Sequence, residues 1–72
     1  MTSTWLILLE RTSRNWSAHA PDLPGCVATG RTRAQTLARM REAIALHLQG
    51  LREDGLEVPK ATTQAERVRV AA

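Results

Sequence analysis

Short apolar runs separated by polar turns occupy the first thirty residues of the chain. The run Trp5–Leu9 is continuous and too short for a helix, which predicts a strand with both faces covered. After a polar, turn-forming stretch, Trp16–Ala20 alternates, so that its apolar side chains share one face. This pattern predicts a half-buried second strand, antiparallel to the first. A third short strand is predicted at Cys26–Gly30.

One long amphipathic helix is predicted after the strands. Its apolar residues recur at spacings of three and four and form one stripe: Leu37, Met40, Ile44, Leu48 and Leu51. Thr32 and Gln35 match a capping box at the start, because the Thr hydroxyl accepts a hydrogen bond from the amide three residues later. Gly55 follows Asp54 as the natural residue beyond the C-cap. The helix should therefore span about residues 33–53, roughly 30 Å at 1.5 Å per residue.

The segment Ala65–Val70 alternates between charged and apolar residues, with Val68 and Val70 on one face. We predict a fourth strand there, and its charged opposite face favours the edge of the sheet. The predicted fold class is therefore α+β, in the order β-β-β-α-β, with an antiparallel sheet and one long helix on a face. A single helix covers one face only, whereas the first strand is apolar on both. A second copy of the chain is the economical cover, which predicts a homo-oligomer, most simply a dimer.

A rigid turn joins the second and third predicted strands and consists of Pro21, Asp22, Leu23, Pro24, Gly25 and Cys26. Each proline locks its φ angle and the glycine permits φ > 0, so the segment should form a fixed corner. Gly25 is expected to adopt φ > 0, and Asp22 to bond local amides as in an Asx turn. Cys26 is expected to be a small buried residue rather than a nucleophile, since no His or Asp is placed to activate it.

Length and composition restrict the function classes. A chain of 72 residues is one domain, and it buries only about 60% of the surface that its unfolded form exposes. With a single cysteine no intrachain disulfide can form, and no spacing suits a metal site, so neither metal nor cofactor is expected. The apolar run near the N-terminus is far too short to cross a bilayer, and no signal peptide is recognisable. A cytoplasmic protein without membrane contact is predicted.

No catalytic constellation is recognisable either. The carboxylates that a nuclease would need are Glu10, Asp22 and Glu42, and their spacing brings no pair to a shared site. His47 lies beside the apolar stripe without a partner and is expected to be a core-edge residue. His19 should point away from Trp16 on its strand, either exposed or in contact with a partner. The chain is therefore predicted not to be an enzyme.

From Trp5 to Pro59 the chain resembles the N-terminal domain of HicB-type antitoxins. The features that match, in order, are the apolar first strand, Trp16, the Pro21–Cys26 turn, Gly30 with Thr32, Glu42-Ala43-Ile44, and Asp54-Gly55 followed by Pro59. The resemblance implies that residues 1–72 form a single HicB-like antitoxin domain. It also implies a truncated ribonuclease-H-like fold without nuclease activity.

The function implied by the resemblance is that of an antitoxin in a type II toxin-antitoxin system, which binds a HicA-like, RNA-cleaving toxin and neutralises it sterically. The residues that we expect to bind a partner are His19, Asp22, Val68 and Val70, with strand addition at Ala65–Val70 considered first. Family members often carry a C-terminal DNA-binding domain, and because this sequence stops at Ala72, direct DNA binding is not expected.

The net charge of +3 suggests an alternative function. Arg33, Arg41 and Arg52 are spaced to form a basic strip on the helix, which suits nucleic acid, although a solvated helix face is the other interpretation. The alternative is thus a small basic nucleic-acid-binding or regulatory protein without a toxin partner. Such a protein would bind DNA or RNA with an affinity that depends on salt.

Overall fold

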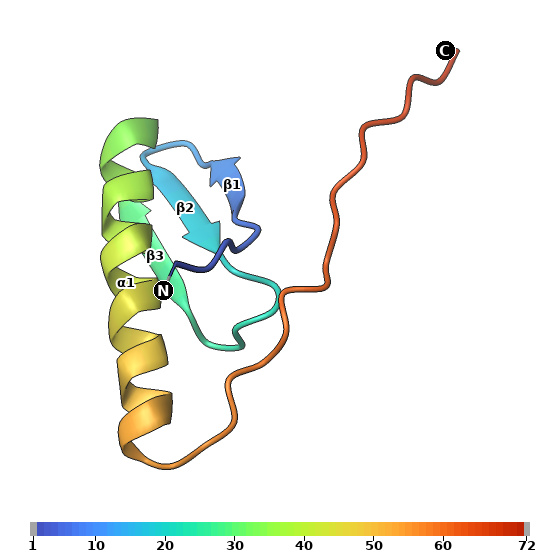
Figure 1. Ribbon diagram of the computed structural model, residues 1–72. Helices are drawn as coiled ribbons and strands as arrows, with labels where there is room; N and C mark the ends of the chain where they lie inside the picture. Colours follow the sequence, from blue (N-terminus) through green and yellow to red (C-terminus); the bar gives the residue numbers. More distant parts are fainter. Residues whose placement is uncertain (1, 72) are drawn as a thin grey trace.

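The structure is a computed structural model that describes residues 2–71, with three antiparallel strands followed by one long helix (Figure 1). The strands are β1 (Leu8–Arg11), β2 (Trp16–His19) and β3 (Val27–Gly30), and helix α1 spans Arg33–Glu53. The sheet has the order β1-β2-β3, and α1 lies across one of its faces. These elements confirm the α+β class and the β-β-β-α part of the predicted order. The ribonuclease-H-like character stays a prediction.

The pairing register decides which side chains of the sheet face the helix. Leu9, Ala18 and Ala28 lie opposite one another across the three strands, so they share one face. Ala18 is buried, and both Leu9 and Ala28 pack against the core. This is therefore the face that α1 covers.

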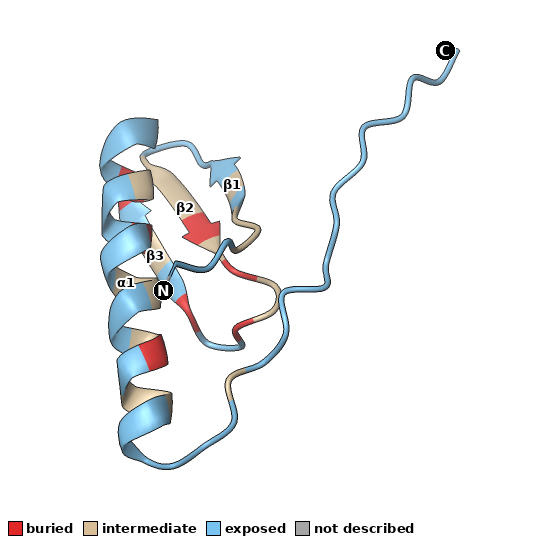
Figure 2. Ribbon diagram, viewed as in Figure 1, coloured by how far each residue is buried: buried red, intermediate tan, exposed pale blue. Residues whose placement is uncertain are grey.

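The core is small and lies between α1, the sheet and the turn that joins β2 to β3 (Figure 2). Its buried apolar residues come from all three parts: Ala18, Ala20, Leu23, Cys26, Met40 and Leu48. The largest fully buried side chains are those of Leu23, Met40 and Thr36. Met40 and Leu48 of the predicted helical stripe are buried, and its other members, Leu37, Ile44 and Leu51, are half-buried.

Side-chain hydrogen bonds close the N-terminal end of α1. The Thr32 hydroxyl accepts from the Gln35 amide at 3.0 Å, and the Gln35 side-chain oxygen accepts from the Arg31 amide at 2.8 Å. In a capping box the second bond would return to the amide of the capping residue itself. Here it returns to the preceding residue, so the box is offset by one position.

The C-terminal end of α1 is closed by backbone amides. Gly55 has φ +67°, its amide donates to the Arg52 carbonyl at 3.1 Å, and the Leu56 amide donates to the Leu51 carbonyl at 2.8 Å. This pair of bonds defines a Schellman ending, which requires a left-handed residue that glycine adopts without strain. Within residues 2–71, no helix combines the length and the apolar character that crossing a membrane requires.

The strand boundaries differ from the predicted ones because pairing sets them. β1 begins at Leu8, since Leu8 pairs with His19, and it continues to Arg11, which pairs with Trp16. The earlier part of the apolar run, including Trp5 and Ile7, packs against the core without forming a strand. Ala20 and Cys26 likewise fall outside β2 and β3 and belong to the turn between them.

The predicted fourth strand at Ala65–Val70 is wrong for the single chain. Residues 56–71 have no regular secondary structure, and all of them except Val58 are exposed. A strand requires a neighbouring backbone to pair with its N–H and C=O groups. Residues 64–71, here called the C-terminal tail, make no backbone hydrogen bond with the described part of the chain. Figure 1 shows the tail leaving the body on the side of β1.

Candidate functional site

The segment between β2 and β3 consists of two consecutive reverse turns that share Leu23. The Leu23 amide donates to the Ala20 carbonyl at 3.0 Å, and the Cys26 amide donates to the Leu23 carbonyl at 3.0 Å. The Ala20 amide closes the segment by donating to the Cys26 carbonyl at 3.2 Å. Gly25 follows Pro24 with φ +81°, as a type II turn requires. The two turns together hold the fully buried Leu23 side chain in the core.

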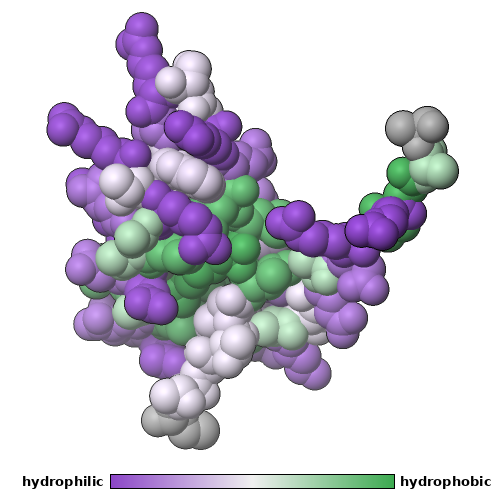
Figure 3. Space-filling model, turned by 90° about the horizontal axis from the view of Figure 1, so that it is seen from above, coloured by the Kyte–Doolittle hydropathy of each residue, from purple (hydrophilic) through white to green (hydrophobic). Residues whose placement is uncertain are grey.

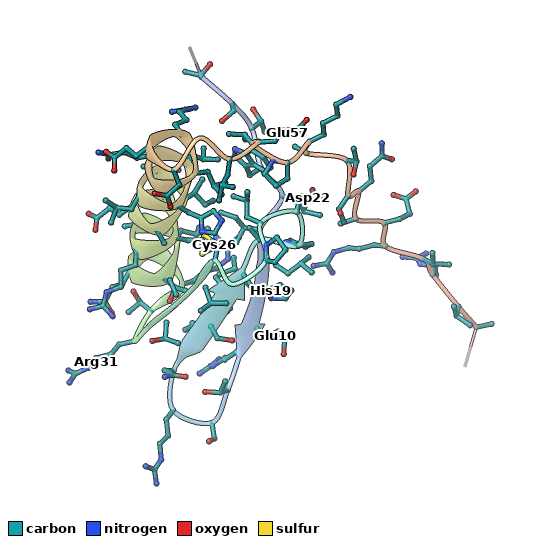
Figure 4. All side chains as sticks on the ribbon, turned by 90° about the horizontal axis from the view of Figure 1, so that it is seen from below. Glu10, His19, Asp22, Cys26, Arg31 and Glu57 are labelled. Atoms are coloured by element: carbon teal, nitrogen blue, oxygen red, sulfur yellow. The ribbon has the colours of Figure 1, made fainter. Side chains whose placement is uncertain are left out.

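Asp22 projects from this segment toward the C-terminal part of the chain (Figure 4). Its carboxylate accepts from the Thr63 hydroxyl at 2.6 Å and from the Thr63 amide at 3.0 Å. The prediction that Asp22 bonds local amides is therefore wrong, since these donors lie 41 residues away in the sequence. These two hydrogen bonds tether the chain at Thr63, immediately before the tail begins. Sequence reasoning missed Thr63, because nothing in the residue pattern marks it.

We expect this tether to weaken in acid. The hydrogen bond from the Thr63 hydroxyl lowers the pKa of Asp22 below its ordinary value of 3.8, against an opposing effect of desolvation. Because the bonds favour the carboxylate, the tether is intact above pH 3.8 and is lost as the pH falls through the lowered pKa. The chemical shift of the Thr63 amide proton, followed from about pH 6 to about pH 2, should titrate with a midpoint below that value.

A matched variant supplies the control for this titration. Asp22→Asn keeps the shape of the side chain and removes the charge, so its Thr63 amide should show no such midpoint. A wild-type midpoint at or above the ordinary Asp value would contradict the tether.

The face of the sheet that points away from α1 is uncovered. Alternation along the strands places two rows on it, which together we call the open face: Leu8, His19 and Val27, then Glu10, Ser17 and Thr29. Leu8 is 37% exposed and Val27 is 63% exposed. Figure 4 shows His19 and Glu10 on the side of the sheet away from the helix. The open face thus carries two exposed apolar side chains, Leu8 and Val27, on either side of the half-buried His19.

The open face does not share the positive charge of the whole chain. Glu10 is the acidic residue in its two rows, while Arg11 falls on the opposite face by alternation. Asp22 adds a second carboxylate in the turn that follows β2. Against a net charge of +3, the open face and its adjoining turn therefore present acidic groups around apolar side chains.

A groove of about 590 Å³ lies between the N-terminal segment and α1. Apolar side chains form most of its walls, including Trp5, Ile7, Leu37, Ile44 and Leu48, and Arg41 is the charged residue in its lining. Figure 3 shows apolar surface in the middle of the molecule, with hydrophilic side chains around it. Such a groove offers contact area but no group that transfers protons or attacks a substrate.

The residues considered for catalysis do not come together. Within residues 2–71, no three His, Cys, Asp or Glu side chains lie close enough to hold a metal ion. Glu10 lies on the open face, Asp22 bonds Thr63, and Glu42 is exposed on α1. Cys26 is buried, and burial raises the pKa of its thiol, which keeps it protonated and a poor nucleophile. His47 is half-buried on α1, as expected for a core-edge position.

The arginines expected to form a basic strip are exposed on α1 but do not form a single line. At about 100° per residue, Arg41 and Arg52 lie on the same side of the helix, and Arg33 is turned about 80° away. The Arg39 guanidinium donates to the Thr29 carbonyl at 2.9 Å, which ties it to β3. Two aligned arginines are a small footprint for a phosphate backbone.

Comparison with known proteins gives two matches. A family model described as "HicB_like antitoxin of bacterial toxin-antitoxin system" matches residues 5–71. The "Uncharacterized 14.9 kDa protein in rep-hol intergenic region" of Haemophilus phage HP1 (strain HP1c1) is 34% identical over 55 residues. That match covers 76% of this chain and 41% of the phage protein, so the chain spans less than half the length of this relative. No solved structure matches the chain.

Proposed function

Since the chain belongs to the HicB-like antitoxin family of bacterial toxin-antitoxin systems, we propose that it binds a small, RNA-cleaving toxin of the HicA type and neutralises it by steric cover. The observation that carries this proposal is the family match, which extends over the sheet, the helix and the tail. Steric cover requires a rigid surface and no catalytic residue. The scattered carboxylates and the buried thiol are compatible with that role.

The open face is the surface that we propose for the toxin. A toxin that cleaves RNA must attract a polyanion, so the surface that an antitoxin covers is basic. An antitoxin surface therefore needs neutral or acidic groups, and most of this chain's charge has the wrong sign. The open face supplies Glu10, with Asp22 in the adjoining turn, around the exposed apolar side chains of Leu8 and Val27.

The face of the sheet is smaller than a typical protein–protein interface. Three strands of four residues cover about 13 Å by 14 Å. A typical specific interface buries about 800 Å² on each partner, several times that area. We therefore propose that the toxin also contacts the turn beyond β2. His19 and Asp22, which we expected to bind a partner, would then belong to the interface.

Co-expression with a small toxin of the HicA type tests the proposal. The wild-type chain should restore growth and form a complex with the toxin on a sizing column. Val27→Lys should abolish both, because it replaces the most exposed apolar side chain of the open face with a cation that would meet a basic toxin. Leu46→Lys is the matched control, since Leu46 is 69% exposed on α1 and lies outside the open face, and it should behave like the wild type.

Two outcomes would reject the proposal. One is failure of the wild-type chain to rescue growth or to form a complex. The other is salt-dependent binding of DNA or RNA by the chain alone, which would support the alternative of a small nucleic-acid-binding or regulatory protein. The homodimer, the single-domain organisation and the absence of enzymatic activity stay predictions.

A further inference from the structure

We propose that the C-terminal tail of one copy adds as a strand to the free edge of β1 in a second copy, so that two chains exchange tails. The interface would join the alternating segment Ala65–Val70 to the outer edge of Leu8–Arg11. It makes no use of the toxin, but the added strand would lie at the edge of the open face, so its arginines and the proposed toxin interface would share Glu10. Three features of the structure lead to it.

The first feature is the unpaired outer edge of β1. β1 is an outer strand, and β2 is its partner on the inner side. Its apolar residues point to both faces, because Leu8 lies on the open face and Leu9 packs toward the core. An edge strand with apolar side chains and unpaired backbone groups attracts another strand unless something covers it.

The second feature is a tail that has the pattern of a strand but makes no backbone hydrogen bond with the described part of its own chain. Val68 is 76% exposed and Val70 is 78% exposed, although alternation gives them a common apolar face. The tether between Asp22 and Thr63 fixes where the tail starts. From there the seven residues to Val70 reach roughly 23 Å when extended. Figures 1 and 4 both show the tail directed away from the body.

The third feature is charge complementarity, which selects the orientation of the added strand. If Val68 and Val70 lie beside Leu9, the residues Arg67 and Arg69 fall on the open face beside Glu10. The opposite orientation would place both arginines on the side of Arg11, with like charges together. Opposite charges on neighbouring strands stabilise a sheet, and like charges destabilise it.

A second copy can fill the free edge of β1 and take up the free tail at the same time. Every copy carries one free β1 edge and one free tail, so a two-fold pair leaves neither exposed. Each added strand pairs its backbone along β1 and removes the valines from water. The sheet in each half then has four strands, the last contributed by the partner copy.

The mass of the full-length chain in solution tests this exchange, in the absence of any toxin. Light scattering at micromolar concentration should give twice the 8.0 kDa chain mass. The double variant Val68→Lys with Val70→Lys should raise the dissociation constant about 100-fold or more, since both valines lose their burial. Its helical circular dichroism signal should stay unchanged, because both side chains are exposed within one chain and lie outside α1. Leu46→Lys, an equally exposed apolar position on α1, should leave the dimer intact.

Reversal of charge tests the orientation. Glu10→Lys should weaken the dimer by about tenfold, and combining it with Arg67→Glu and Arg69→Glu should restore the wild-type mass. A monomeric wild-type chain would overturn the exchange. A dimer that withstands the valine substitutions, or one that Leu46→Lys also disrupts, would overturn it as well.

Discussion

Leu23→Ala is expected to destabilise the protein by about 2–5 kcal/mol, the usual cost of removing a large side chain from a filled core. Leu23 is completely buried at the junction of two reverse turns, and its own amide and carbonyl hold both turns together. The backbone is therefore fixed around the cavity and cannot collapse into it. A domain of this size has a stability of only about 3–5 kcal/mol, so the variant should be largely unfolded.

Urea denaturation followed by circular dichroism measures this effect. Leu56→Ala removes the same atoms from a side chain that is 57% exposed, and it should change the free energy of unfolding by less than about 1 kcal/mol. A variant of Leu23 that unfolds at the wild-type urea concentration would show that the turn does not anchor the core.

Gly30→Ala and Gly50→Ala are expected to change stability in opposite directions, although the chemical change is the same. A Cβ atom at Gly30 would lie 2.6 Å from Thr36 Oγ1 and 3.0 Å from the Thr36 amide nitrogen. The hydroxyl cannot move aside freely, because Thr36 is fully buried and its Oγ1 donates to the Thr32 carbonyl at 2.7 Å. Pushing β3 away from the helix start should cost about 1–3 kcal/mol.

At Gly50 the added methyl group meets nothing within 4 Å, and the residue lies inside α1. Gly50→Ala should therefore raise the free energy of unfolding by about 1 kcal/mol, which is the difference in helix propensity between alanine and glycine. Thermal denaturation of the two variants against the wild type gives the sign of each effect. If Gly30→Ala left the stability unchanged, the result would contradict the close contact between β3 and the start of the helix.

The sequence predicted best those features whose signals are local. Both ends of α1 agree with the predicted range, because Thr32 closes the start and Gly55 the end through bonds to residues within five positions. Strand ends were less accurate, since they depend on the partner strand rather than on the apolar run itself. The tail shows this most clearly. Its alternating charged and apolar residues indicate that it can form a strand, but they do not indicate which strand it would pair with.

Features that join distant residues were outside the reach of sequence reasoning. The bond between Asp22 and Thr63 spans 41 positions and leaves no periodic trace. His19 was singled out by its place on a strand, but its neighbours on the open face follow from the register of three strands. That register also revealed Glu10 as part of a surface, where the sequence had suggested only a possible catalytic acid.

The order of the elements also bears on how quickly the molecule forms. The strands are neighbours in space in the order in which they occur in the chain, and the helix that covers them comes next. Few long loops must close before contacts stabilise the chain, a topology that favours rapid folding. We expect each newly made copy to complete its sheet and helix on its own. Joining the tail of another copy is then a separate, slower event whose rate depends on protein concentration.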